Sequence, residues 1–189
     1  MKIPFCLPII KNKKADVFKM VRNNIHRYAY FEVWLDYIDD FDDAFIKQLI
    51  KLLREKLILL FRRQNLEKVK MELEKRLKVI SLQESSQSLI DLDVFDQKEE
   101  LECIRNNRLA VKTIVSYHDY KETPDNRKLE KIIDTMKIYK PSIFKISTMC
   151  NSQQDALRLL QLLLELKQNN LKCIVLLTVA GILPIFSKI

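Results

Sequence analysis

Glycine is almost absent from this sequence, occurring once in 189 residues. Tight turns and loops that cradle phosphate groups normally use glycine, because it adopts positive φ readily and lets a ligand approach the backbone. The phosphate-binding loop GxxxxGKS/T and the dinucleotide fingerprint GxGxxG each need more than one glycine. The sequence therefore excludes both kinds of nucleotide site.

Long hydrophobic runs and paired cysteines are also missing. No stretch reaches the roughly 18 uncharged apolar residues that suggest a membrane span. The apolar N-terminus is broken by Pro4 and Pro8 and is too short for a secretory signal. The four cysteines never form CxxC, so neither a zinc site nor a redox pair is indicated. We expect a soluble, cytoplasmic protein with no membrane partner, whose cysteines are small buried hydrophobic residues.

Basic residues are in moderate excess, since 33 Lys and Arg against 25 Asp and Glu give a net charge of +8. This balance admits an anionic small molecule, an acidic partner or nucleic acid. The basic residues are scattered through helical patterns without an aromatic-interleaved motif, so nucleic acid is not the expected partner. With 48% hydrophobic and 31% charged residues, the chain is predicted to be globular.

Short apolar or β-branched runs alternate with longer runs of helical period, which is typical of repeated βα units around a parallel sheet. No linker or change of composition divides the chain, so residues 1–189 are predicted to form one domain. Seven strands are predicted, at residues 3–9, 29–35, 57–61, 89–94, 111–116, 143–148 and 173–179.

Helices are indicated between these strands by apolar residues three and four positions apart, most clearly in residues 45–53 and 129–136. Ser152, with Asp155 three residues later, has the pattern of a capping box. The leucine-rich run that continues to Leu166 has a wide apolar stripe. We therefore expect this helix to be heavily buried.

A series of βα units allows either an open doubly wound sheet or a closed barrel. In both folds the functional site lies at the carboxyl ends of the strands, and polar residues contributed by many strands favour the barrel. Such residues follow or end most of the predicted strands: Glu32, Asp36, Arg62, Asp91, Asp93, His118 and Lys145.

Lys145 is the first candidate for a reacting group, because it is a single ammonium in the otherwise apolar strand at residues 143–148. Burial would lower the pKa of this lysine and make its amine available to attack a carbonyl, as Schiff-base catalysis requires. From this stretch alone, a strand-end lysine that extends to water is the simpler interpretation.

His118 lies just after the preceding predicted strand, at its carboxyl end, and an imidazole one strand away from an amine is suited to proton transfer. A histidine hydrogen-bonded at the start of a loop is equally consistent with the sequence. Glu32, Trp34 and Asp36 share the parity of the second predicted strand, so they should point to one side. Arg62 is a candidate partner for these carboxylates, and a structural salt bridge is the alternative.

Five short motifs occur along the chain: EVWLD (32–36), LFR (60–62), IDLD (90–93), SYHDYKETP (116–124) and KISTM (145–149). In this order they resemble the E-x-R-x-D, T-F-R, I-D-L-D/E, S-x-H-D/N-F/Y-x-x-T-P and K-I-x-x-M motifs of type I 3-dehydroquinate dehydratases. The resemblance covers nearly the whole chain, and its last two motifs are specific as a pair.

The resemblance implies a TIM-type (β/α) barrel that converts 3-dehydroquinate to 3-dehydroshikimate in the shikimate pathway of aromatic amino acid biosynthesis, without a metal or organic cofactor. It implies that Lys145 forms an imine with the substrate ketone and that His118 transfers protons. It further implies that Glu32 and Arg62 hold the substrate hydroxyls and that Lys188 binds the substrate carboxylate. A small anionic substrate is the expected partner, and a homodimer is an open alternative.

The chain also departs from the family pattern. Trp34 stands where the family has an arginine, and LEK at residues 66–68 replaces E-G-G and so removes the glutamate that partners the histidine. Lys188 replaces an arginine and Pro184 a glycine; a lysine keeps the charge but cannot form a bidentate fork. Relatives continue beyond the position of Ile189, so we expect an incomplete barrel of about seven βα strands, without the eighth strand and the lid.

Two functions from different classes follow. The first is a Schiff-base dehydratase, supported by the retained Lys145, His118, Glu32 and Arg62. The second is a degenerate, non-catalytic barrel fragment whose basic exposed edge binds a partner. Another Schiff-base lyase, such as an aldolase, fits the lysine but not the motif at residues 116–124. Substrate turnover and trapping of an imine distinguish these alternatives.

Overall fold

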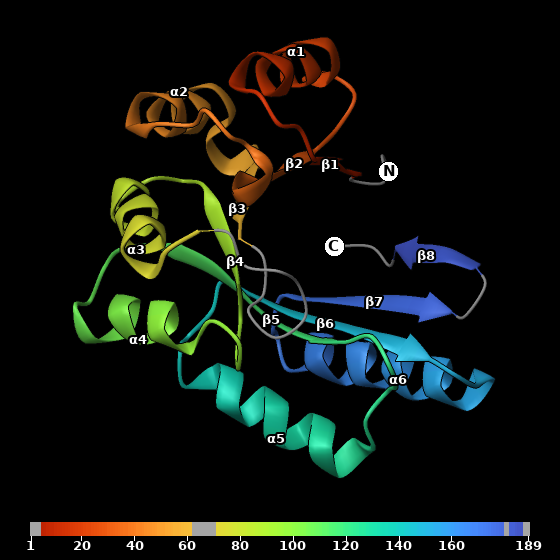
Figure 1. Ribbon diagram of the computed structural model, residues 1–189. Helices are drawn as coiled ribbons and strands as arrows, with labels where there is room; N and C mark the ends of the chain where they lie inside the picture. The colour runs from red at the N-terminus through yellow and green to blue at the C-terminus, as the bar shows by residue number, and fades with distance from the viewer. Residues whose placement is uncertain (1–4, 62–70, 180–181, 187–189) are drawn as a thin grey trace. The chain divides into compact units, whose positions relative to one another are not determined.

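The computed structural model describes residues 5–61, 71–179 and 182–186. Contacts along the chain group into two compact units, which Figure 1 shows from the red N-terminus to the blue C-terminus. The first unit comprises residues 1–92 and 96–113, and the second comprises residues 93–95 and 114–189.

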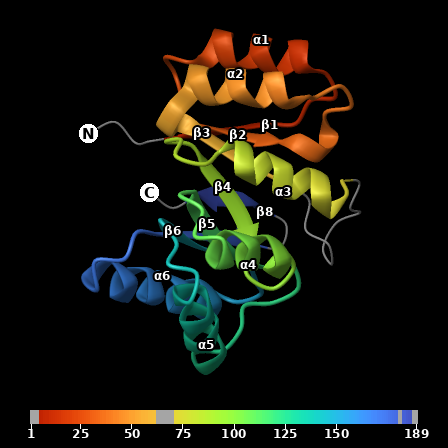
Figure 2. The same cartoon turned by 90° about the vertical axis from the view of Figure 1, so that its left-hand side faces the viewer.

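In the first unit, strands alternate with helices, and four strands pair in parallel with their neighbours in sequence order. Its elements are β1 (Cys6–Ile9), α1 (Lys14–Asn24), β2 (Tyr30–Trp34), η1 (Leu35–Tyr37), α2 (Asp43–Leu53), η2 (Arg54–Lys56), β3 (Leu57–Leu60), α3 (Leu73–Leu82), β4 (Leu89–Asp93) and α4 (Lys98–Asn106). The helices α1 and α2 lie side by side on one side of β1 to β3 in both views (Figures 1 and 2).

Local sequence signals account for α2. The side chain of Asp42 accepts a hydrogen bond from the Phe45 backbone N–H at 2.8 Å and so caps the first turn. The apolar spacing predicted for residues 45–53 is confirmed, because Phe45, Ile46, Leu49 and Leu53 are all buried. This stripe forms part of the core of the first unit.

In the second unit, three parallel strands are followed by one antiparallel strand. Its elements are β5 (Lys112–Asp119), α5 (Asn126–Lys137), β6 (Ile143–Cys150), α6 (Gln153–Gln168), β7 (Cys173–Val179) and β8 (Ile182–Phe186). Figure 1 shows α5 and α6 on the same side of β5, β6 and β7. The opposite face of these strands is therefore the face that could carry a site.

The predicted capping box at the start of α6 is confirmed, since Ser152 and Asp155 bond each other's backbone N–H groups. The prediction that α6 is heavily buried is wrong. Leu159 is fully buried, but Leu157 and Leu164 are 59% and 61% exposed. β7 is followed by β8 rather than by a helix, so no helix described in this unit covers that flank of α6.

The seven predicted strands are all present, although the first begins at Cys6 and its residues 3–4 lie outside the described residues. β5 and β6 run further than predicted, so His118 lies within its strand. Asp36 lies in η1 and not in β2, so it does not share the strand parity of Glu32. The sequence was expected to lack an eighth strand, but β8 follows β7 and pairs with it in the antiparallel direction, so it is not a further βα strand. It was missed because its five residues contain Pro184, which weakens a strand signal.

Among the residues that the structure describes, five other than glycine have positive φ: Arg54, Ser85, Arg108, Lys140 and Asn170. Each lies between the end of a helix, from α2 to α6, and the strand that follows. Glycine is the usual residue at such a helix end because it has no Cβ to clash. Because the chain has almost no glycine, residues with side chains adopt positive φ at these helix ends.

None of the described helices is long and apolar enough to span a membrane. All four cysteines are free thiols. Cys150 and Cys173 are buried as expected, and burial raises the pKa of both thiols. Cys6 and Cys103 are half-buried, so the expectation of buried cysteines holds for two of the four.

Candidate active site

The strands β5 and β6 carry both predicted reacting groups on one face. In the parallel register, Ser116 pairs with Lys145 and His118 pairs with Ser147. Side chains alternate along a strand, so His118 and Lys145 lie on the same face of adjacent strands, two residues apart in register. Strand spacing and rise give roughly 8 Å between their Cα atoms. Two long side chains at this separation can contact one small molecule.

This face of the sheet is shielded from water. Lys145 is 7% exposed and His118 is 8% exposed. The opposite face packs against the helices, where the hydroxyl groups of Thr123 and Thr148 lie 3.0 Å apart. A lysine that extended into water would be more exposed than Lys145, whereas burial is what an imine-forming amine requires.

His118 is held by a carboxylate from the end of β4. Asp93 Oδ2 lies 3.1 Å from His118 Nδ1, and both side chains are almost fully buried. An ionised carboxylate can only accept a hydrogen bond, so Nδ1 donates and Nε2 carries the ring's lone pair. The ring of Tyr120 meets that of His118 edge-on, with 6.3 Å between centroids. The contacts with Asp93 and Tyr120 thus fix the orientation of the His118 ring.

Sequence reasoning placed Asp93 at a strand end but did not pair it with the histidine. The sequence did contain a signal for this pairing, because Asp93 ends β4 and His118 lies near the end of the next strand along the chain. Ser116, which pairs in register with Lys145, was missed as well. Ser116 is fully buried, and its hydroxyl has no hydrogen-bond partner among the described residues. A buried hydroxyl beside an amine is available to a bound ligand.

Glu32 belongs to the first unit, where it lies on β2 opposite the buried Phe31 and Val33. The indole Nε1 of Trp34 donates a hydrogen bond to Glu32 Oε1 at 3.1 Å. The Trp34 ring in turn packs edge-on against Tyr37, with 5.9 Å between centroids. The residue that replaces an arginine of the family motif is therefore itself a partner of this carboxylate.

Two predicted binding residues, Arg62 and Lys188, lie outside the described residues. His118 and Lys145 are brought together within the second unit, and Glu32 is placed within the first. Among the residues that the structure describes, no cluster of His, Cys, Asp or Glu could hold a metal ion.

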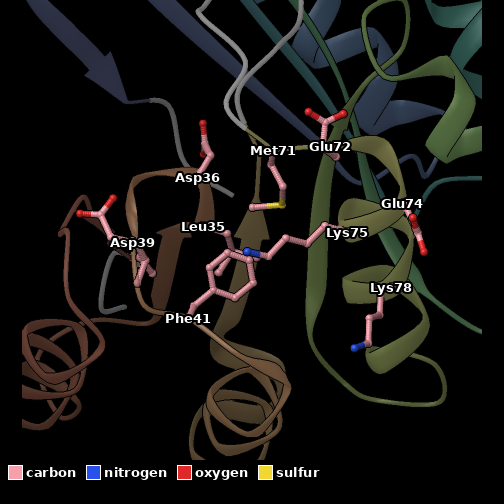
Figure 3. A pocket seen from close by; sticks show the side chains of 10 residues that line it. Leu35, Asp36, Asp39, Phe41, Met71, Glu72, Glu74, Lys75 and Lys78 are labelled. Carbon is pink, nitrogen blue, oxygen red and sulfur yellow. The ribbon is translucent and has the colours of Figure 1, made fainter.

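A cavity of about 470 Å³ opens in the first unit, between the end of β2 and α3 (Figure 3). Acidic and basic side chains both line it, including Asp36, Glu72 and Lys78. Figure 3 shows Lys75 reaching to the Phe41 ring, and its Nζ lies 4.0 Å from the ring centroid. This is the geometry of a cation-π contact. The cavity contains neither His118 nor Lys145 and supplies no comparable pair of reacting groups.

Tyr117 is a nearby titratable group with a structural role. Its hydroxyl donates to Asp119 Oδ2 at 3.2 Å, and burial, followed by the charge of Asp119, raises the pKa of the phenol above its usual value. Strand parity puts Tyr117 on the face opposite His118. It stays neutral in the physiological range and does not share the face of the reacting groups.

Comparisons with known proteins agree with one another. A family model described as Type I 3-dehydroquinase matches residues 5–181. The 3-dehydroquinate dehydratase of Coxiella burnetii is 35% identical over 65 residues, which are 34% of this chain and 28% of that protein. That of Methanocaldococcus jannaschii is 29% identical over 82 residues, which are 42% of this chain and 37% of that protein. The matched stretches thus span about a third of these curated relatives.

Solved structures give the same result for the fold. The type I 3-dehydroquinate dehydratase of Clostridium difficile, solved with covalently modified comenic acid, has a TM-score of 0.76 at 21% identity, over 93% of this chain and 75% of that one. The dehydratase of Enterococcus faecalis has a TM-score of 0.76 at 20% identity, over 94% and 80%. The predicted fold class, an incomplete TIM-type (β/α) barrel of about seven βα strands, is therefore confirmed.

Proposed function

This chain belongs to the type I 3-dehydroquinase family, and on that premise we propose that it dehydrates 3-dehydroquinate to 3-dehydroshikimate through a Schiff base. The observation that carries the proposal is the pair of buried groups, Lys145 and His118, on one face of adjacent strands. We also propose that residues 1–189 act as one (β/α)-barrel domain of a cytoplasmic enzyme of the shikimate pathway.

The first stage is formation of an imine at Lys145. The neutral Nζ attacks the substrate ketone carbon, the carbonyl oxygen takes up a proton from water, and the attacking nitrogen passes one of its protons to His118 Nε2, which gives a carbinolamine. His118 then protonates the leaving hydroxyl, which departs as water and leaves a protonated C=N bond. One carbonyl oxygen has become one water, and the positive nitrogen is now an electron sink.

The second stage is the elimination. His118 Nε2 removes a proton from the carbon next to the imine carbon, and the C–H electron pair moves toward the imine nitrogen. The resulting enamine expels the hydroxyl group on the following carbon, and His118 returns its proton so that the group leaves as water. Hydrolysis of the new conjugated imine consumes one water, releases 3-dehydroshikimate and restores the Lys145 amine.

The substrate is a polyhydroxylated carboxylate, which suits a basic protein with a net charge of +8. We propose that Glu32 and Arg62 bind the substrate hydroxyls and that Lys188 binds the carboxylate. The hydrogen bond from Trp34 orients the Glu32 carboxylate for this purpose. A small anionic molecule is thus the proposed partner of the site.

Borohydride trapping tests this proposal. The protein is incubated with 3-dehydroquinate and borohydride, digested, and examined by peptide mass spectrometry. Reduction of the C=N bond makes the adduct permanent, so we expect a ligand-dependent mass increase on the peptide that contains Lys145. The method detects the nucleophile even where turnover is slow.

Two variants make the trapping experiment specific. Lys145→Ala should abolish the adduct and lower kcat by on the order of 10⁴-fold or more, because the covalent route is lost. Lys131→Ala removes an exposed lysine of α5 and should leave the adduct unchanged. Equal adduct in Lys145→Ala would refute the assignment. No adduct in a folded wild-type sample would favour the non-catalytic, partner-binding alternative.

A further inference from the structure

We infer that Asp93 is the positioning residue for His118, setting both the tautomer and the orientation of its imidazole. The inference rests on the proposed function, since it concerns the histidine that transfers protons in that reaction. Asp93 Oδ2 lies 3.1 Å from His118 Nδ1, and the two side chains are 3% and 4% exposed. A buried carboxylate this close to a buried imidazole fixes which ring nitrogen holds the proton.

Backbone groups immobilise the carboxylate itself. The backbone N–H of Phe95 donates to Asp93 Oδ1 at 3.0 Å, so each carboxylate oxygen has its own partner. The Phe95 ring packs edge-on against Tyr117 at 5.9 Å between centroids, and Val94 N–H donates to the Ser116 carbonyl at 2.7 Å. The two residues that follow Asp93 are therefore both joined to β5.

This geometry has a chemical consequence. With Nδ1–H donated to Asp93, the lone pair lies on Nε2, which can act as the base. When Nε2 takes a proton, the carboxylate stabilises the imidazolium that forms, as in a catalytic triad. Asp93 contacts the Nδ1 side of His118, and Nε2 is the nitrogen that transfers the proton in the proposed reaction, so loss of Asp93 should act on kcat more than on KM.

The tautomer can be measured directly, because the chain has only two histidines. His26 is exposed in the loop after α1 and serves as an internal reference in ¹⁵N-histidine NMR spectra. In the wild-type protein at neutral pH, we expect His118 to carry its proton on Nδ1. Asp93→Asn should reduce that tautomer, because a neutral amide no longer selects for it, and Asp93→Glu should retain it.

Steady-state kinetics provide the second readout. We expect Asp93→Asn to lower kcat by about 10²- to 10⁴-fold with KM changed less than about threefold, because a misplaced or wrong tautomer disables proton transfer. Asp93→Glu should recover kcat to within about tenfold of wild type. Asp134→Asn, at an exposed position of α5, is the matched control and should change neither constant.

The two readouts separate this inference from the proposed function. An unchanged His118 tautomer and an unchanged kcat in Asp93→Asn would overturn it. If Asp93→Asn does not fold, a Glu variant that is folded but has lost the Nδ1–H tautomer and kcat would do the same. Absence of turnover and of a Lys145 adduct in wild type would refute the proposed function, while the NMR comparison would still decide whether Asp93 sets the tautomer.

Discussion

The polar side chains on strand β2 of the first unit differ from those of the second unit in burial and in hydrogen-bond partner. In the second unit, Lys145, His118 and Asp93 are buried, and His118 has a carboxylate partner. On β2, Glu32 is half-buried and hydrogen-bonded to Trp34, a residue that stands in place of the arginine of the family motif. The proposed bond-making groups match the family motifs, whereas on β2 the proposed substrate-holding Glu32 matches its motif but has a different hydrogen-bond partner, Trp34.

This contrast predicts a division between kinetic constants. Groups that act on the transition state affect kcat, whereas groups that hold substrate and transition state equally affect KM. Substitutions of Lys145, His118 or Asp93 in the second unit should therefore lower kcat, and those on β2 should change KM. A variant that broke this division would show that the two sets of residues are not separable in function.

After Lys145→Ala, the largest effect is expected for His118→Ala. Loss of the acid and base should lower kcat by about 10²- to 10⁴-fold, because proton removal and departure of water both depend on it. Binding should change much less, so KM should stay within a few-fold of wild type. Stopped-flow measurement of imine formation should also show a slower rate. An unchanged rate would remove His118 from the mechanism.

A smaller effect is expected at Trp34. Trp34→Phe removes the indole N–H that donates to Glu32, and a hydrogen bond to a charged group contributes about 1.5–3 kcal/mol. We expect KM to rise by about tenfold while kcat is nearly constant. Trp34→Arg restores the family residue and should lower KM instead. A kcat loss in Trp34→Phe as large as that of His118→Ala would contradict the comparison.

The smallest effect concerns stability alone. Ser152→Ala removes the cap of α6, which should lower the free energy of unfolding by about 1 kcal/mol without changing kcat, because α6 covers the other face of the strands.

The hydrogen bond from Arg158 lowers the pKa of Asp155. The stability that this carboxylate contributes is present above its unfolded pKa and is lost as pH falls through the lowered one. Urea titrations at pH 7 and at pH 3 measure both effects.

Much of the fold could be predicted because its signals are local. The capping box of Ser152 and Asp155 lies within four residues, and the apolar spacing of α2 recurs along one helix. The burial of α6 was predicted wrongly for the opposite reason. A stripe of leucines indicates that a helix has an apolar face, but it does not indicate whether another element covers Leu157 and Leu164.

The site could be predicted only in part. Lys145 and His118 were identifiable from their strands and motifs, whereas the partner of the histidine depends on how separate strands are aligned. The bond from Trp34 to Glu32 depends on side-chain rotamers that a sequence does not display. Pairings between residues distant in sequence, such as Asp93 with His118, need the three-dimensional register.

The left-handed residues at the helix ends have a consequence for heat resistance. At Arg54, Ser85, Arg108 and Lys140 the side chain makes this backbone conformation unfavourable by roughly 1–2 kcal/mol. A glycine at these positions would remove that unfavourable free energy. About half of the resulting increase in the free energy of unfolding would be offset by the greater entropy of the unfolded chain. For a protein of this size, about 1 kcal/mol corresponds to about 2–4 °C in Tm. A few turns therefore limit the melting temperature, as well as the packing of the strands. Substituting glycine at these turns should raise the melting temperature without changing the reacting groups.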